Sequence, residues 1–149
     1  MEYNEYVDIV ENRYFGNVAK MQFSAVLDCF TDDATVLIYH GDNEPRRFSR
    51  DGKNGDVLIS FFDHLTGNFS ARFENFMHYV DPAANRCASR FLVTLDPKEE
   101  SDYFPEGQQQ LNNCNFFDFR DELIEHMIIY YSNSRAQSRA TPTGYPKKS

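Results

Sequence analysis

Two asparagines interrupt an apolar strand pattern near the end of the chain. In residues 108–119, Asn113 and Asn115 alternate with neighbours that place them on the same face as Leu111 and Phe117. A buried amide that lacks partners costs about 1–3 kcal/mol. Either each amide is paired with backbone or a neighbouring strand, or the two face a cavity and bind a ligand carbonyl or water there.

Acid-base chemistry near neutral pH would draw on a histidine, and His40 is the candidate. It lies two residues after Ile38, on the same face of a predicted strand. We therefore expect it to reach the mouth of a pocket, where it could act as a base. The alternative is a solvated histidine at a strand end. The four histidines show no H-x-H or H-E-x-x-H spacing, so we predict no metal site and no cofactor.

Three helices are predicted to position these residues. The first places Tyr14 on a buried stripe that continues to Val18, although Gly16-Asn17 is a typical place for a helix to stop. The second covers residues 23–30 and ends at "TDDA". The third covers residues 57–65, with Gly67 just beyond its end.

A curved sheet is predicted to supply the rest of the pocket. Residues 34–40 are β-branched and apolar, which indicates a strand covered on both faces. After Gly67 the period changes from 3.6 to 2, and the segments 68–80, 86–95, 108–119 and 123–131 form an antiparallel meander. Such long strands must twist and curl. We therefore predict an α+β fold, with three helices packed on a strongly curved, mostly antiparallel sheet that forms a cone with an apolar interior.

Strict alternation assigns the residues of these strands to two faces. In residues 68–80 it places Met77 on the face of Phe69 and Phe73, and Phe76 and Val80 on the opposite face. On the last strand, Ile124 and Ile128 share a face. The residues Phe76, Val80, Ile124 and Ile128 would then form an apolar outer surface.

Composition limits the classes of function. Aromatic residues make up 15% of the 149 residues, which favours an aromatic core or, more specifically, a cavity for an apolar ligand. The 23 acidic residues outnumber the 15 basic ones, which disfavours binding to nucleic acid. We predict one domain over residues 1–132 and a disordered basic tail over 133–149.

Cysteine usage and hydropathy indicate a compartment. Cys29, Cys87 and Cys114 are odd in number and form no C-x-x-C motif, so we expect three free thiols. Neither a signal peptide nor an apolar run long enough to cross a bilayer is visible. We predict a cytoplasmic protein that does not associate with membranes.

Three motifs resemble one known superfamily. "ENRYFGN", "AVLDCFTDDATV" and the closing "FFDFRDELIEHM" are similar to the nuclear-transport-factor-2-like (SnoaL-like) superfamily, which includes ketosteroid isomerase and scytalone dehydratase. The resemblance covers residues 3–131. It implies a cone fold, but no single activity, because this fold hosts isomerases, dehydratases, cyclases, hydrolases and non-catalytic binding proteins.

The resemblance assigns roles only in part. Tyr14 matches the catalytic tyrosine of the ketosteroid isomerases, whereas Ile38 stands at the position of their base and cannot take a proton. Asn115 stands where those enzymes have a protonated Asp, and it is similar to the Asn of scytalone dehydratase. The histidine of the dehydratases falls near Phe73 rather than at His78. The resemblance also places Met127 and Tyr131 on the cavity side. The residues expected to line the pocket are Ile38, Phe61, Phe73, Met77, Asn113, Phe117, Met127 and Tyr131.

Two functions follow from these residues. In the first, Tyr14, Asn115 and His40 bind a hydrophobic, carbonyl-bearing compound and act on it by cofactor-independent acid-base chemistry of the isomerase, dehydratase or cyclase type. In the second, the domain is not catalytic and forms homodimers or binds a protein through the open face of its sheet. The two functions are compatible, because members of the superfamily often dimerise through that face.

Overall fold

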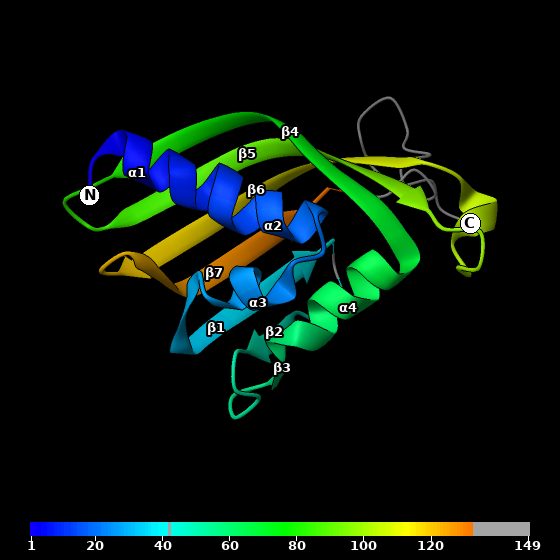
Figure 1. Ribbon diagram of the computed structural model, residues 1–149, viewed down its shortest axis with the longest axis horizontal. Helices are drawn as coiled ribbons and strands as arrows, with labels where there is room; N and C mark the ends of the chain where they lie inside the picture. Colours follow the sequence, from blue (N-terminus) through cyan, green and yellow to red (C-terminus); the bar gives the residue numbers. More distant parts are fainter. Residues whose placement is uncertain (42, 133–149) are drawn as a thin grey trace.

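The computed structural model describes residues 1–41 and 43–132, and the predicted basic tail at 133–149 lies outside these residues. A long N-terminal helix lies across the concave face of a curved, open sheet, and a second long helix covers one end of it (Figure 1). The helices are α1 (Tyr3–Val7), η1 (Asp8–Phe15), α2 (Gly16–Ala19), α3 (Phe23–Leu27), α4 (Leu58–Asn68) and η2 (Phe104–Glu106). The strands are β1 (Phe30–His40), β2 (Arg46–Ser49), β3 (Asp56–Val57), β4 (Phe69–Asp81), β5 (Arg86–Pro97), β6 (Gln109–Arg120) and β7 (Leu123–Tyr131).

The N-terminal helix is continuous from α1 to α2 and is π-helical in its middle part, η1. The backbone N–H of Gly16 donates to the carbonyl of Glu11, five residues earlier, as a π-helix requires. In this segment the adjacent residues Tyr14 and Phe15 both lie buried. The helix continues through Gly16-Asn17, in keeping with the buried stripe that reaches Val18, and ends at Ala19.

The other two predicted helices are present with shifted ends. Helix α3 stops at Leu27, and Phe30 opens β1, so the "TDD" segment belongs to the strand. Helix α4 starts one residue later than predicted, because the extended backbone of Val57 caps it. The helix also includes Gly67, which needs no left-handed backbone at that position.

The sheet has the order β3-β2-β1-β7-β6-β5-β4. Strands β4 to β7 form the predicted antiparallel meander. Strand β1 lies parallel to β7 and pairs antiparallel with β2, so the segment between the helices joins the edge of the meander. These features confirm the α+β class, with three helices packed on a mostly antiparallel sheet.

A β-bulge in β4 reverses the assignment of faces. Glu74 pairs with Leu92 and Met77 pairs with Arg90, so Asn75 and Phe76 together stand opposite one residue, Phe91. Asn75 has φ 59°, a left-handed conformation that asparagine tolerates better than most residues. The side chains before the bulge keep their predicted face, and those after it exchange faces.

The bulge corrects two predictions. Met77 is 46% exposed on the outer face, so the prediction that it lines the pocket is wrong. Phe76 and Val80 pack against the core rather than on the outer surface. A second irregularity, opposite Asp118 and Phe119, brings Ile124 inside together with Met127.

We predict that Asn75→Val lowers the free energy of unfolding by about 1–2 kcal/mol, because a β-branched residue is strained at positive φ. Asn75→Gly should stay within about 0.5 kcal/mol of the wild type, since glycine adopts this conformation freely. Urea titration measures both. Arg72→Val, at a regular position of the same strand, is the matched control. Equal tolerance of valine at positions 72 and 75 would contradict the bulge.

Candidate functional site

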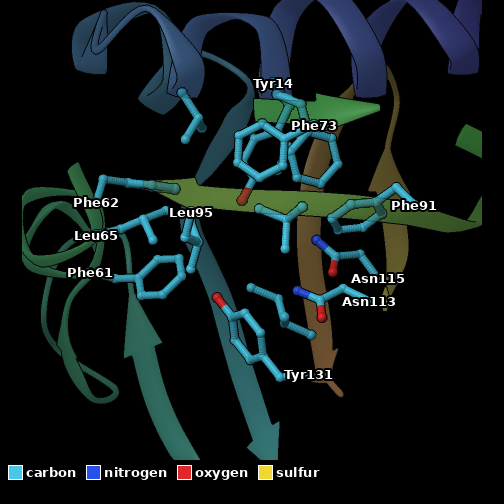
Figure 2. Close-up of a pocket in the computed structure, with 14 residues that line it drawn as sticks. Tyr14, Phe61, Phe62, Leu65, Phe73, Phe91, Leu95, Asn113, Asn115 and Tyr131 are labelled. Atoms are coloured by element: carbon cyan, nitrogen blue, oxygen red, sulfur yellow. The ribbon is translucent and has the colours of Figure 1, made fainter. Parts of the chain in front are cut away.

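A small cavity lies between the N-terminal helix, α4 and the concave face of the sheet. Its volume is about 30 Å³, enough for one or two water molecules. Most of its wall is apolar, and its polar groups converge from three elements (Figure 2). The lining residues are Tyr14, Phe15, Val18, Phe61, Phe62, Leu65, Phe73, Phe91, Val93, Leu95, Asn113, Asn115, Ile129 and Tyr131.

The two asparagines of β6 lie at this cavity in different states. Asn115 is 1% exposed, and its Nδ2 donates a long bond of 3.6 Å to the Met127 sulfur. Its Oδ1 is buried and accepts no hydrogen bond from any residue that the structure describes. The Oδ1 of Asn113, by contrast, accepts a bond of 3.3 Å from the backbone N–H of Ser132. Asn115 therefore lies in the cavity wall and holds an unpaired acceptor.

Two tyrosines supply hydroxyl groups from opposite sides. In Figure 2 the hydroxyl of Tyr14 points from the helix toward the centre, and Tyr131 rises from β7 toward Leu95. Burial raises the pKa of Tyr14 well above its ordinary value, and the nearby Tyr131 raises it further. Burial also raises the pKa of Tyr131 to about 12, although the charge of Arg46 opposes this shift. Both hydroxyls are therefore protonated donors at neutral pH.

A larger space, here called the vestibule, adjoins the inner cavity. Its volume is about 340 Å³, which falls in the range of small-molecule sites, whereas the inner cavity is far smaller. The two spaces share the lining residues Phe61, Leu65, Leu95 and Tyr131, which form the partition between them. The other vestibule residues are Ile38, His40, Asn43, Glu44, Arg46, His64, Phe69, Tyr103, Gln109 and Leu111.

His40 lies in the wall of the vestibule. Its ring packs 5.5 Å, centroid to centroid, from the ring of Tyr131, its pairing partner across β1 and β7. The Nε2 atom is buried and has no hydrogen-bond partner among the described residues. Burial, and secondarily the charge of Arg46, lower the pKa of His40, which keeps the imidazole neutral at pH 7.

The structure separates the predicted site residues into four groups. The four places are the inner cavity, the vestibule, the core behind the inner cavity and the outer face of the sheet. The inner-cavity residues come from the helices and from three strands, and the residues found only at the vestibule come from β1. Phe117 and Met127 lie buried behind the inner cavity, where Phe117 packs edge-on against Tyr14. Met77 lies outside. The inner group is Tyr14, Phe61, Phe73, Asn113, Asn115 and Tyr131, and the vestibule group is Ile38 and His40, with Phe61 and Tyr131 shared.

A partly buried chain of polar side chains was not predicted from the sequence. His78 Nε2 lies 2.7 Å from the Glu11 carboxylate, and His78 Nδ1 lies 2.7 Å from Ser89 Oγ. Ser89 in turn stands directly opposite Asn115 in the sheet. The chain ties η1 to β4 and β5. Strict alternation predicted His78 on the outer face, but the bulge in β4 turns it inward. The sequence signal for the bulge was Asn75, because asparagine tolerates positive φ.

Other kinds of site find little support in the part of the chain that the structure describes. Within residues 1–41 and 43–132, no group of three or more His, Cys, Asp or Glu side chains is arranged to hold a metal ion. None of the described helices has the length and apolar character needed to span a bilayer. Cys29, Cys87 and Cys114 are free thiols whose pKa values burial raises.

No protein-family model and no curated protein matches the chain. Solved structures match it well. SalBIII, an epoxide hydrolase/cyclase-like enzyme in pyran ring formation in the polyether salinomycin, has a TM-score of 0.67 at 14% identity over 88% of this chain and 93% of its own. PrhC from Penicillium brasilianum has a TM-score of 0.67 at 14% identity, and the match covers 87% of this chain and 81% of PrhC.

An NTF2-like protein from Burkholderia xenovorans gives a similar result. Its TM-score is 0.64 at 12% identity, with 89% of this chain and 92% of that chain covered. At such identities the likeness concerns the fold alone. The chain therefore has the NTF2-like cone fold that the motifs around Tyr14, Asp32 and Phe117 suggested.

Proposed function

We propose that the protein binds a small hydrophobic compound that carries a carbonyl group. The observation that supports this most is the Tyr14 hydroxyl, a protonated donor in a mostly apolar, aromatic wall that also holds the unpaired Oδ1 of Asn115. An unpaired buried acceptor costs about 1–3 kcal/mol, and proteins retain such groups mainly where they serve a function. A ligand hydroxyl or enol would satisfy this acceptor.

The sizes of the two spaces determine how such a ligand would lie. The inner cavity of about 30 Å³ accepts only a polar end such as a carbonyl or hydroxyl group. The body of the ligand would occupy the vestibule of about 340 Å³. The carbonyl oxygen would then pass the partition at Phe61 and Tyr131 and meet the hydroxyl of Tyr14.

This arrangement supports acid-base chemistry without a cofactor. Tyr14, held protonated by burial, donates to the carbonyl oxygen and stabilises negative charge that develops there. Asn115 Oδ1 orients a hydroxyl or enol of the same ligand. His40, neutral at pH 7, is the base candidate, and it acts on a proton that the ligand presents in the vestibule. Isomerisation, dehydration and cyclisation all use these steps. The cyclase-like name of SalBIII is in keeping with the last of them.

A matched pair of probes tests the binding proposal. We predict that 2-acetylnaphthalene binds about three- to tenfold more tightly than 2-ethylnaphthalene, because one hydrogen bond contributes about 0.5–1.5 kcal/mol. Tyr14→Phe should remove this preference and leave the hydrocarbon's affinity unchanged. Fluorescence titration measures all four affinities. Failure of both probes to bind, or an equal affinity for the two, would refute the proposal.

The outer face of the sheet supports a second property. Two rows of mostly apolar residues, with one arginine, cross five strands there: Tyr79, Ala88, Phe116, Ile128 and Leu37 stand opposite one another, and so do Met77, Arg90, Cys114, Tyr130 and Tyr39. Tyr79, Phe116 and Tyr130 are 58%, 46% and 44% exposed. We propose that a second copy of the chain covers these rows, as a homodimer.

The oligomeric state tests this property. We predict that the wild type sediments as a dimer at micromolar concentration, and that Phe116→Glu shifts it to monomer because a carboxylate would be buried in the interface. Arg72→Glu, on the same face but outside both rows, is the control and should leave the dimer intact. A wild type that is monomeric at these concentrations would contradict the proposal.

The three free cysteines support a reducing compartment for the protein, and we propose the cytoplasm.

A further inference from the structure

The vestibule differs from the inner cavity in its charge. Arg46 lies opposite Ile38 in the pairing of β2 with β1, so its side chain stands on the concave face of the sheet. Arg47, the next residue, belongs to the outer face. The Arg46 guanidinium carbon lies 6.0 Å from the centre of the Phe48 ring, over its face. A cation is thus placed in the vestibule wall, beside its aromatic and aliphatic residues.

Nothing in the described chain neutralises this cation directly. No carboxylate of the described residues forms a salt bridge with Arg46 within 4.0 Å. Glu44 also lines the vestibule, but it is exposed and forms no such bridge. The positive charge of Arg46 acts on two residues of the vestibule wall: it contributes to the lowered pKa of His40 and opposes the rise in the pKa of Tyr131.

Three donors therefore meet at one end of the cone. Arg46, His40 and Tyr131 come from the adjacent strands β2, β1 and β7, and His40 pairs directly with Tyr131. Among the described residues, the buried Nε2 of His40 has no partner and lies in the vestibule wall. Guanidinium and imidazole N–H groups are strong donors to carboxylates, particularly where the surroundings are partly desolvated.

We propose that the vestibule recognises the carboxylate of an amphipathic ligand, with Arg46 as its charge partner and His40 Nε2–H as a second donor. The neutral imidazole then carries its proton on Nε2, and Nδ1 is the nitrogen that remains to act as the base. This deepens the function proposed above and rests on it. The carboxylate lies at the mouth, the apolar body fills the vestibule, and a carbonyl at the far end passes the partition to Tyr14. The ligand class is then a hydrophobic keto acid rather than a neutral ketone.

A keto acid and its methyl ester test the proposal, since the two share every carbon of the chain and differ in charge. We predict by isothermal titration calorimetry that 9-oxodecanoate, whose carbonyl lies at the end of the chain away from the carboxylate, binds the wild-type protein about tenfold more tightly than its methyl ester. The preference should shrink as salt is raised, because a partly exposed ion pair is screened.

Variants at two adjacent arginines locate the effect. Arg46→Gln should reduce the preference for the acid to about twofold or less, and Arg46→Lys should retain part of it. Arg47→Gln removes the same charge from the outer face and should keep the full preference. His40→Gln should weaken binding of the acid more than binding of the ester. Because Arg46 and Arg47 are both exposed, these variants are expected to fold.

The outcomes distinguish the two proposals. If acid and ester bind the wild type equally well, the carboxylate site is refuted and the ketone pocket stands. If the preference persists in Arg46→Gln, or disappears equally in Arg47→Gln, Arg46 is not the partner. If neither compound nor 2-acetylnaphthalene binds, both the carboxylate site and the proposed function are overturned.

Discussion

The packing of Tyr14 against the sheet and α4 determines how much of the cone remains empty. Its ring makes edge-on contacts with Phe15, Phe30, Phe62 and Phe117, at centroid distances between 4.6 and 6.1 Å. Edge-to-face aromatic contacts fill space efficiently and hold a ring in one orientation. The N-terminal helix is thereby fixed over the sheet, and the hydroxyl of Tyr14 is directed into the small volume that remains.

The π-helical segment η1 carries both Tyr14 and Phe15 into this packing. Both side chains are buried, and the ring of Phe15 also packs against Phe73, Phe76 and Phe91 of β4 and β5. The Glu11–His78–Ser89 chain holds the same segment to β4 and β5 with two contacts of 2.7 Å. Polar and aromatic contacts thus position one helix, which in turn places the hydroxyl of Tyr14 in the same cavity as Asn115.

Much of this could be read from the sequence, and the exceptions have physical causes. The change of period at Gly67 predicted the meander, and the alternation around Asn115 placed the amides inside. Alternation fails wherever a strand carries an extra residue, because a single insertion exchanges the two faces. The bulge at Asn75 therefore moved Met77 out and His78 in. The sequence also held no direct signal for the partition at Phe61 and Tyr131, which depends on how distant elements meet.

The free acceptor of Asn115 is the central claim, and the free energy of unfolding of Asn115→Leu, measured by urea titration beside Asn113→Leu, tests it most directly. Asn113→Leu should lose about 1–3 kcal/mol, because the backbone N–H of Ser132 is left unpaired. Asn115→Leu should be neutral or stabilising, since it removes an unpaired acceptor. A loss for Asn115→Leu as large as that for Asn113→Leu would show that Asn115 is a paired structural amide, and would contradict the claim.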